Sequence, residues 1–248
     1  MKDLCIVALA EGRYKKYIGL FTLCARTAYP EYDVLVIQTK PDAAAVKTLH
    51  FASCERYLLD FSAYKYVYIT DIDMMIMREQ PDLLSFHLKE IEQTGLPYSN
   101  VPRWHEPFGE NRLTGLHFVT REWWDITREA RKRELEKLRK GEIGNCKCDD
   151  ELMLMRIAKE SGLTIPKNSN LVIRHHGIHI GTFRDNKDKT LQTIKTAVSK
   201  RVTPDFARQW QEIMKTEGYR LASYNIRKDV QIAWELKQID KYTSQLAK

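Results

Sequence analysis

The first 73 residues alternate between short apolar runs and amphipathic stretches, and this order limits the chain to few folds. Three runs rich in β-branched and aromatic residues predict strands: 4–10, 32–39 and 65–73. Between them, residues 14–28 and 41–59 have the spacing and the start signals of helices. Strands that alternate with helices predict an α/β fold with a mostly parallel sheet flanked by helices.

Two aspartates, Asp71 and Asp73, stand two residues apart at the end of the third predicted strand, in the run YVYITDIDMMIM. Ligands of parallel sheets bind at the carboxyl ends of strands, so the position of this pair is informative. Burying two carboxylates close together is costly. A divalent cation can compensate them. Alternatively, one aspartate caps a turn and the other forms a surface salt bridge.

Beyond residue 73 the alternation breaks down. The remaining elements are a strand, a long charged helix, an amphipathic helix and a strand that leads into a glycine-bearing loop, expected at 113–120, 121–142, 149–163 and 170–184. From about residue 190 the chain is helical and basic in character. We therefore expect one domain, 1–189, and a basic helical extension, 190–248, packed on that domain.

The composition and net charge favour some classes of partner but do not identify the function. The 248 residues carry a net charge of +7, which favours polyanionic partners such as nucleic acid, anionic lipid or phosphorylated substrates. No segment has the length of a membrane span, and the odd number of cysteines, five, argues against a disulfide framework. We expect a cytoplasmic protein, with peripheral contact to the inner face of a membrane as an alternative. The C-x-C at Cys146 and Cys148 is interpreted as a reduced loop.

Several segments together resemble the GT-A (Rossmann-like) fold glycosyltransferases with a D-x-D motif, and in particular the glycogenin-like (family 8-type) galactosyl- and glucosyltransferases. The similar segments occur in the same order as in the family: EGRYKKYIGLFTLCART, YVYITDIDMMIM, LTGLHFVTREWWD, DDELMLMRIAKESGL and HIGTFR. The resemblance covers roughly residues 3 to 185. It implies transfer of a hexose from a nucleotide sugar, a UDP-sugar, to a hydroxyl acceptor.

The resemblance also implies a metal site for Mn²⁺ or Mg²⁺. Asp73 would bind the metal directly, and Asp71 would bind it too or reach the ribose. Three histidines, His175, His176 and His179, are close enough in sequence to supply one further ligand, although a strand histidine is usually structural. We favour His179, because Gly181 and Arg184 then fall in register with the family loop, and His176 is the second candidate.

The nucleotide-sugar donor would be bound, by the same resemblance, at positions from the first strand, the D-x-D segment and the two glycine-bearing loops: Ala8, Ala10, Tyr14, Asp71, Gly115, Gly181 and Arg184. Arg184 stands where the family usually has lysine, and its guanidinium suits a phosphate. Asp149, Asp150 and Glu151 begin a predicted helix, which is where acids favour the helix dipole. In the functional interpretation Asp150 and Glu151 are catalytic, with Asp150 favoured.

The acceptor stays open. A glycan or a lipid-linked glycan is our first expectation, and hydroxymethylated DNA bases are an alternative, with the basic stretches 128–140 and 184–201 tracking phosphates. Two other classes use similar residues or charge. A metal-dependent nuclease or phosphohydrolase would hydrolyse without sugar transfer, and a non-catalytic nucleic-acid-binding protein would not need Asp71 and Asp73.

Overall fold

The computed structural model describes residues 3–38, 51–105, 110–146, 148–165, 176–181 and 202–246. The chain divides into two compact units, which are described separately. The first comprises Met1–Glu11, Leu35–Asp71 and Leu84–Ile173, and the second comprises Gly12–Val34, Ile72–Leu83 and Arg174–Lys248.

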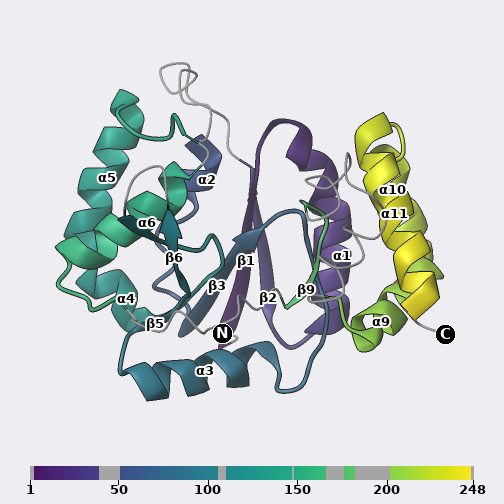
Figure 1. Cartoon of the computed structure of the whole chain (residues 1–248), viewed down its shortest axis with the longest axis horizontal. Coiled ribbons are helices and arrows are strands. Elements are labelled where there is room, and N and C mark those ends of the chain that lie inside the picture. The colour runs from purple at the N-terminus through teal and green to yellow at the C-terminus, as the bar shows by residue number, and fades with distance from the viewer. Residues whose placement is uncertain are drawn as a thin grey trace. The chain divides into compact units, whose positions relative to one another are not determined.

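The first unit contains a five-stranded sheet in the order β2-β1-β3-β8-β5 (Figure 1). Its strands are β1 (Leu4–Ala10), β2 (Asp33–Gln38), β3 (Tyr66–Asp71), β5 (Tyr98–Ser99) and β8 (His117–Thr120). β1 and β3 pair in parallel, and β8 runs antiparallel to both β3 and β5. Since β1, β3 and β5 therefore point in one direction, the mostly parallel sheet predicted from the sequence is confirmed.

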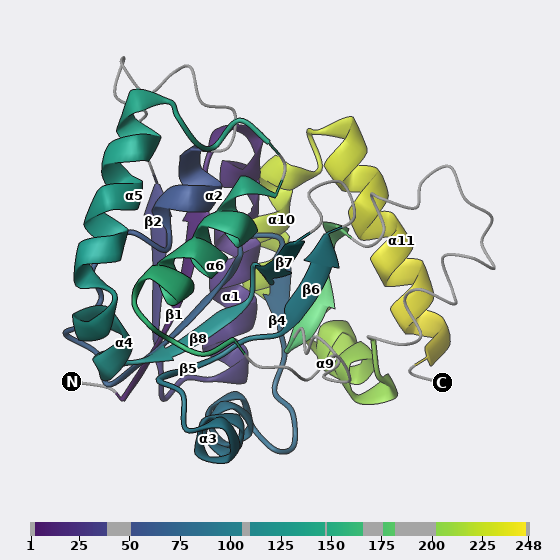
Figure 2. The same ribbon diagram turned by 60° about the vertical axis from the view of Figure 1, so that its left-hand side comes forward.

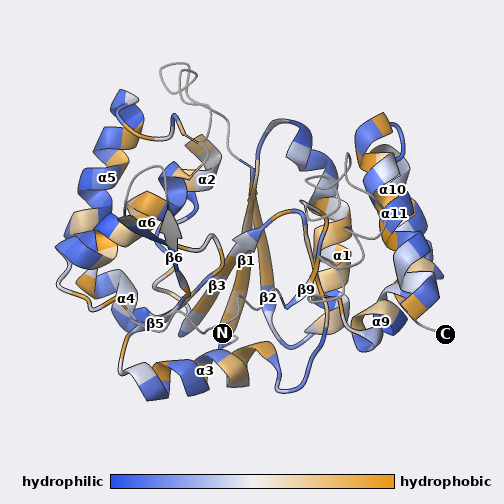
Figure 3. Cartoon of the chain, viewed as in Figure 1, coloured by the Kyte–Doolittle hydropathy of each residue, from blue (hydrophilic) through white to orange (hydrophobic). Residues whose placement is uncertain are grey.

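Helices flank this sheet, as predicted. They are α2 (Phe51–Glu55), α3 (Leu83–Thr94), α4 (Arg121–Ile126), α5 (Arg128–Lys140) and α6 (Asp149–Glu160). α2 contacts β1, α4 contacts β8, and α6 packs against α2 and α5. The core between them is apolar, with both Trp123 and Trp124 almost fully buried. Figure 3 shows the contrast between the hydrophobic central strands and the hydrophilic surface of α5.

Several predicted elements differ in their bounds. The helix predicted at 41–59 ends already at Glu55 in its described part, and for two further elements the structure shows the reason. The helix predicted at 121–142 is interrupted at Thr127, whose hydroxyl donates to the Trp123 carbonyl (2.7 Å) and accepts from Arg131 Nε (3.1 Å). The strand predicted at 113–120 begins only at His117. Leu113 instead ends β7 (Glu110–Leu113), which pairs antiparallel with β6 (Pro102–His105), as Figure 2 shows.

The second unit is largely helical. It contains a 3₁₀ helix (Gly12–Tyr17), α1 (Ile18–Ala28), α9 (Pro204–Met214), α10 (Glu217–Ile226) and α11 (Val230–Leu246). A small antiparallel sheet joins β4 (Met74–Ile76) to β9 (Gly177–His179). The third predicted strand, 65–73, thus ends two residues earlier than expected, at Asp71, and the residues after Asp73 form a separate strand that pairs with β9.

Polar contacts tie the C-terminal helices to the start of α1. The Tyr17 hydroxyl donates to the buried Glu235 carboxylate (2.7 Å), and Lys16 pairs with Asp229 (2.8 Å). The expected domain boundary near residue 189 lies outside the described residues, so the division at 189/190 stays a prediction. No helix in the described part of the chain is both long and apolar enough to cross a bilayer.

Candidate active site

Asp71 is the last residue of β3, at the carboxyl end of the parallel strand pair. Its register partner on β1 is Leu9, so the side chain lies where both strands end. The Asp71 carboxylate is partly exposed, at 36%, and Oδ1 accepts a hydrogen bond from Arg56 Nη1 at 2.6 Å. An aspartate in this place can face a ligand while the arginine holds its orientation.

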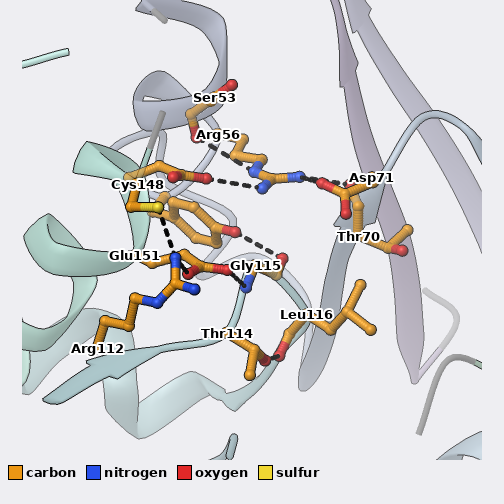
Figure 4. Close-up of polar contacts among 12 residues, drawn as sticks. Ser53, Arg56, Thr70, Asp71, Arg112, Thr114, Gly115, Leu116, Cys148 and Glu151 are labelled. Carbon is orange, nitrogen blue, oxygen red and sulfur yellow. Dashed lines mark hydrogen bonds and ion pairs between the residues drawn. The ribbon is translucent and has the colours of Figure 1, made fainter. Parts of the chain in front are cut away.

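Arg56 follows α2 directly, and its side chain is only 6% exposed. Its guanidinium donates to the carboxylates of Asp71 and Asp150 (3.1 Å to Oδ2) and to the carbonyl oxygens of Thr70 (3.0 Å) and Ser53 (3.2 Å). Figure 4 shows the guanidinium extended towards Asp71. Burial would lower the pKa of Arg56, but Tyr57, Asp71 and Asp150 outweigh burial and raise this pKa well above its ordinary value.

The three acids at the start of α6, Asp149, Asp150 and Glu151, have different partners. Asp149 Oδ2 accepts hydrogen bonds from the backbone N–H groups of Gly144 (2.9 Å), Asn145 (2.7 Å) and Cys146 (2.9 Å), so it fixes the loop before the helix. Asp150 turns inward to Arg56 and is nearly buried. Burial raises the pKa of Asp150, and the charge of Arg56 opposes that rise.

Glu151, also nearly buried, is held by two arginines of the β6–β7 hairpin. Arg103 and Arg112 stand opposite each other in the hairpin register, and both form ion pairs with the Glu151 carboxylate. Burial raises the pKa of Glu151, while Arg103 acts in the other direction. Arg112 also donates to Cys148 Sγ, as Figure 4 shows.

Gly115 joins these groups through its backbone. Its N–H donates to Glu151 Oε1 (3.2 Å), and its carbonyl accepts from the Tyr57 hydroxyl (2.6 Å). A Cβ at this position would stand 2.9 Å from Arg56 Nη2 and 3.7 Å from Asp71 Oδ1. The absence of a side chain therefore leaves room for the buried arginine and its carboxylates.

A buried polar network fixes the loop that carries Gly115. Asn100 Oδ1 accepts from the Thr114 N–H (2.8 Å), and Asn100 Nδ2 lies 3.0 Å from His117 Nδ1. Because Nδ2 is a donor, His117 Nδ1 must accept, which places the imidazole proton on Nε2. Burial lowers the pKa of His117 to about 3, with a further contribution from the charge of Arg56, so the ring is neutral at physiological pH.

In the second unit, the β4–β9 pairing brings His179 to Asp73. His179 is the register partner of Met74, and the Ile180 N–H donates to the Asp73 carbonyl (3.0 Å). His179 Nε2 lies 3.4 Å from Asp73 Oδ1, and the Asp73 side chain is only 6% exposed. This short sheet explains how residues far apart in sequence can share a ligand.

The D-x-D pair and His179 together have the composition of a metal site. The chain itself keeps Asp71 and Asp73 close, because only one residue separates them. One potential ligand atom from each of Asp71, Asp73 and His179 lies within 4.8 Å of the others. Two carboxylates and one imidazole fit a divalent cation such as Mn²⁺ better than a soft metal.

His176, the second candidate ligand, has a different partner. Its Nδ1 contacts the Glu79 carboxylate, and its ring is buried. The residue has a positive φ of 52°, and Gly177 follows with a φ of 156°. A Cβ on Gly177 would approach the Met75 carbonyl oxygen to 2.0 Å, so only glycine fits opposite β4. His176 lies directly before β9, and His179 is the last residue of that strand.

The remaining predicted donor-binding residues are distributed along the chain. Ala8 and Ala10 are fully buried in β1, and Tyr14 lies in the 3₁₀ helix with its ring 6.0 Å from that of Tyr17. Gly181 follows β9 and is buried. Arg184 lies outside the described residues.

The structure thus brings Asp71, Gly115, Asp150 and Glu151 into one network, and Asp73 next to His179. Sequence reasoning missed the cations of this network, Arg56, Arg103 and Arg112. For Arg56 a signal exists: it stands in an apolar stretch (CERYLLDF) that must be largely buried, so it requires acidic partners. Arg103 and Arg112 carry no such signal, because Arg103 stands in an irregular, proline-bearing stretch and Arg112 in the polar run GENR.

No protein-family model matches the chain, and no curated protein is significantly similar to it. Among solved structures, the chain is similar to the crystal structure of the glycosyltransferase GlyE in Streptococcus pneumoniae TIGR4, with a TM-score of 0.50 and 12% sequence identity. The match covers 95% of this chain and 64% of that one, so the chain spans less than two thirds of the length of GlyE. At this identity the similarity shows the fold, which this chain shares with a glycosyltransferase.

Proposed function

We propose that this chain is a metal-dependent glycosyltransferase that moves a hexose from a nucleotide sugar, a UDP-sugar, to a hydroxyl group. The observation that carries the proposal is the group of three potential metal ligands, Asp71, Asp73 and His179, at the carboxyl end of β3. Parallel sheets bind ligands at this end of their strands. The fold shared with GlyE adds support at the level of architecture.

These three potential ligands fit Mn²⁺ or Mg²⁺. Asp73 and His179 would be direct ligands, and Asp71 would be a third ligand or a contact to the ribose. When bound, such an ion would neutralise the charge that grows on the departing nucleoside diphosphate. Arg56 holds Oδ1 of Asp71 and so fixes this carboxylate at the strand end. The partners of the two histidines, Asp73 for His179 and Glu79 for His176, support the preference for His179.

Asp150 is the better candidate of the two proposed catalytic acids. Glu151 is bound by two guanidinium groups and by the Gly115 N–H, which suits a positioning role. Asp150 is bound to one guanidinium, that of Arg56, on the side where Asp71 also lies. In this proposal its carboxylate would stabilise positive charge on the sugar carbon or accept the proton of the attacking hydroxyl.

The first test is a thermal-shift measurement with UDP and Mn²⁺ or with UDP and EDTA. A ligand at 100 times its Kd stabilises by about 2.7 kcal/mol, which raises Tm by roughly 5–10 °C in a chain of this size. Asp73→Asn should abolish the metal-dependent rise, and Asp125→Asn, at an exposed surface pair, should retain it. Equal stabilisation with EDTA would contradict the metal site.

The second test separates the two histidines. We expect His179→Ala to weaken Mn²⁺-dependent nucleotide binding in titration calorimetry more than His176→Ala does. The opposite order would place the ligand at His176. Product analysis by mass spectrometry then separates transfer to an acceptor from hydrolysis, which the nuclease or phosphohydrolase alternative predicts.

A glycan or lipid-linked glycan remains the preferred acceptor. The basic helix α5, which could track DNA phosphates, has most of its cations already engaged: Arg128, Lys132, Arg133 and Lys137 each pair with a carboxylate. This supports a solvated helix face. The other basic stretch, 184–201, lies outside the described residues. Hydroxymethylated DNA should therefore be included among the acceptors tested, beside glycans.

A further inference from the structure

The outer face of α10 and the start of α11 expose large apolar side chains. Leu221, Tyr224 and Val230 are 62%, 63% and 88% exposed. The opposite face of α10 packs the helix into its unit, because Tyr219 and Ile226 are buried there. The exposed apolar residues therefore add nothing to the core of their unit.

Cations accompany these apolar residues. Lys228 Nζ lies 4.3 Å from the centre of the Tyr224 ring, and Arg227 is exposed beside it. A hollow of about 360 Å³ lies next to them, between the end of α9 and one side of α10, and its lining includes both the buried Tyr219 and the exposed Tyr224. Its lining includes three cations, Lys215, Arg220 and Arg227, and one acid, Glu217, so the lining has a net positive charge. Lys215 pairs with Glu212 and Arg220 pairs with Glu217, which leaves Arg227 as the cation of the lining for which no carboxylate pair is recorded among the described residues.

We propose that this face of α10 docks on an anionic membrane surface, with Tyr224 and Leu221 at the level of the headgroups and an anionic headgroup in the hollow. Aromatic and aliphatic side chains beside cations are the combination that binds at a membrane interface. The cations attract anionic lipid, and the apolar side chains gain free energy when they leave water.

A membrane explains both features of the surface better than a nucleic acid does. Phosphate contacts would use Arg227 and Lys228 but would leave Leu221 and Val230 in water. An apolar protein partner would use those two residues but would desolvate the cations around the hollow. A membrane interface keeps the cations hydrated at the headgroups while it covers the apolar side chains.

The test is sedimentation of the full chain with vesicles of phosphatidylcholine alone and with vesicles that contain phosphatidylglycerol. We expect binding only to the second kind. Arg227→Ala with Lys228→Ala should weaken it about 30-fold, the change that corresponds to about 1 kcal/mol for each cation. Leu221→Ser with Tyr224→Ser should also weaken binding to these vesicles, although this double change leaves the charge of the protein unaltered. The matched control, Lys132→Ala with Arg133→Ala on α5, removes two exposed cations and should bind like the wild type within about twofold.

The contrary outcomes are distinct. Equal binding to both kinds of vesicle, no binding to either, or an equal loss in the α5 control would overturn the proposal. Displacement by 10 mM inorganic phosphate, but not by chloride of equal ionic strength, would assign the hollow to a soluble anion. Duplex DNA binding that is lost in the Arg227/Lys228 variant would assign the face to nucleic acid. None of these measurements needs a donor or a metal, so they are independent of the proposed glycosyl transfer.

Discussion

Replacement of Arg56 by methionine tests whether one buried cation holds the centre of the proposed site. The side chain is 6% exposed and binds two carboxylates and two backbone carbonyls. Removing one partner of a buried ion pair costs about 3–5 kcal/mol, because the remaining charge is left without compensation. Asp71 is 36% exposed and can regain water, whereas Asp150 is only 10% exposed. We therefore expect a loss of about 3 kcal/mol, mostly through Asp150.

The assay is urea unfolding, with the free energy of unfolding taken from the transition midpoint and slope. Arg56→Met combined with Asp150→Asn should recover about 2 kcal/mol of the loss, since no buried charge then lacks a partner. Arg133→Met is the matched control, because Arg133 is 54% exposed and pairs with Glu160 at the surface, where a pair contributes at most about 1 kcal/mol. Equal losses for Arg56→Met and Arg133→Met, or strict additivity in the double variant, would refute the reasoning.

Two further predictions concern His117 and Gly177. Folding lowers the pKa of His117 from 6.5 to about 3, so the unfolded chain binds the proton first and stability falls as the pH drops from 6.5 towards 3. His117→Gln should reduce the loss of stability between pH 7 and pH 5 by about 2 kcal/mol in urea unfolding, and parallel pH profiles would contradict this. Gly177→Ala should cost about 3 kcal/mol or more, because its Cβ would meet the Met75 carbonyl oxygen. Gly12→Ala, at a positive φ with nothing within 4 Å, should cost about 1 kcal/mol, and similar losses for both would show that β9 can shift away from β4.

The sequence is most informative where one local pattern determines the structure. A continuous apolar run located β1 (Leu4–Ala10) without error, because a strand buried on both faces has this pattern. The acids before an apolar stretch located the start of α6 at Asp149. Periodicity failed at Thr127, where a side-chain hydrogen bond interrupts a helix. It also failed after Asp73, where β4 pairs with β9, about 100 residues further along the chain. Pairing between distant segments leaves no signature in either segment alone.

In the candidate site, too, some residues follow from a local sequence pattern and others depend on distant segments. Asp71, Asp73, Asp150 and Glu151 could be selected from the sequence because acids at a strand end or a helix start stand in recognisable positions. Which of the three acids at the start of α6 turns inward depends on the loop that Asp149 closes, and that loop was not predictable. The resemblance to a family loop selected His179, and the position of His176 beside Glu79 gives an independent reason for that choice.

The two aspartates of the D-x-D segment have different neighbours, and this difference indicates which of them attracts a metal more strongly. A carboxylate near an apolar strand end must be compensated by a cation, which is a metal ion or a basic side chain. The two aspartates differ in this respect: Arg56 holds Asp71, whereas His179, a potential metal ligand, lies beside Asp73. Arg56 already occupies Oδ1 of Asp71, whereas the neighbour of Asp73 is an imidazole that can itself bind a metal. We therefore expect the charge of Asp73, rather than that of Asp71, to draw the metal.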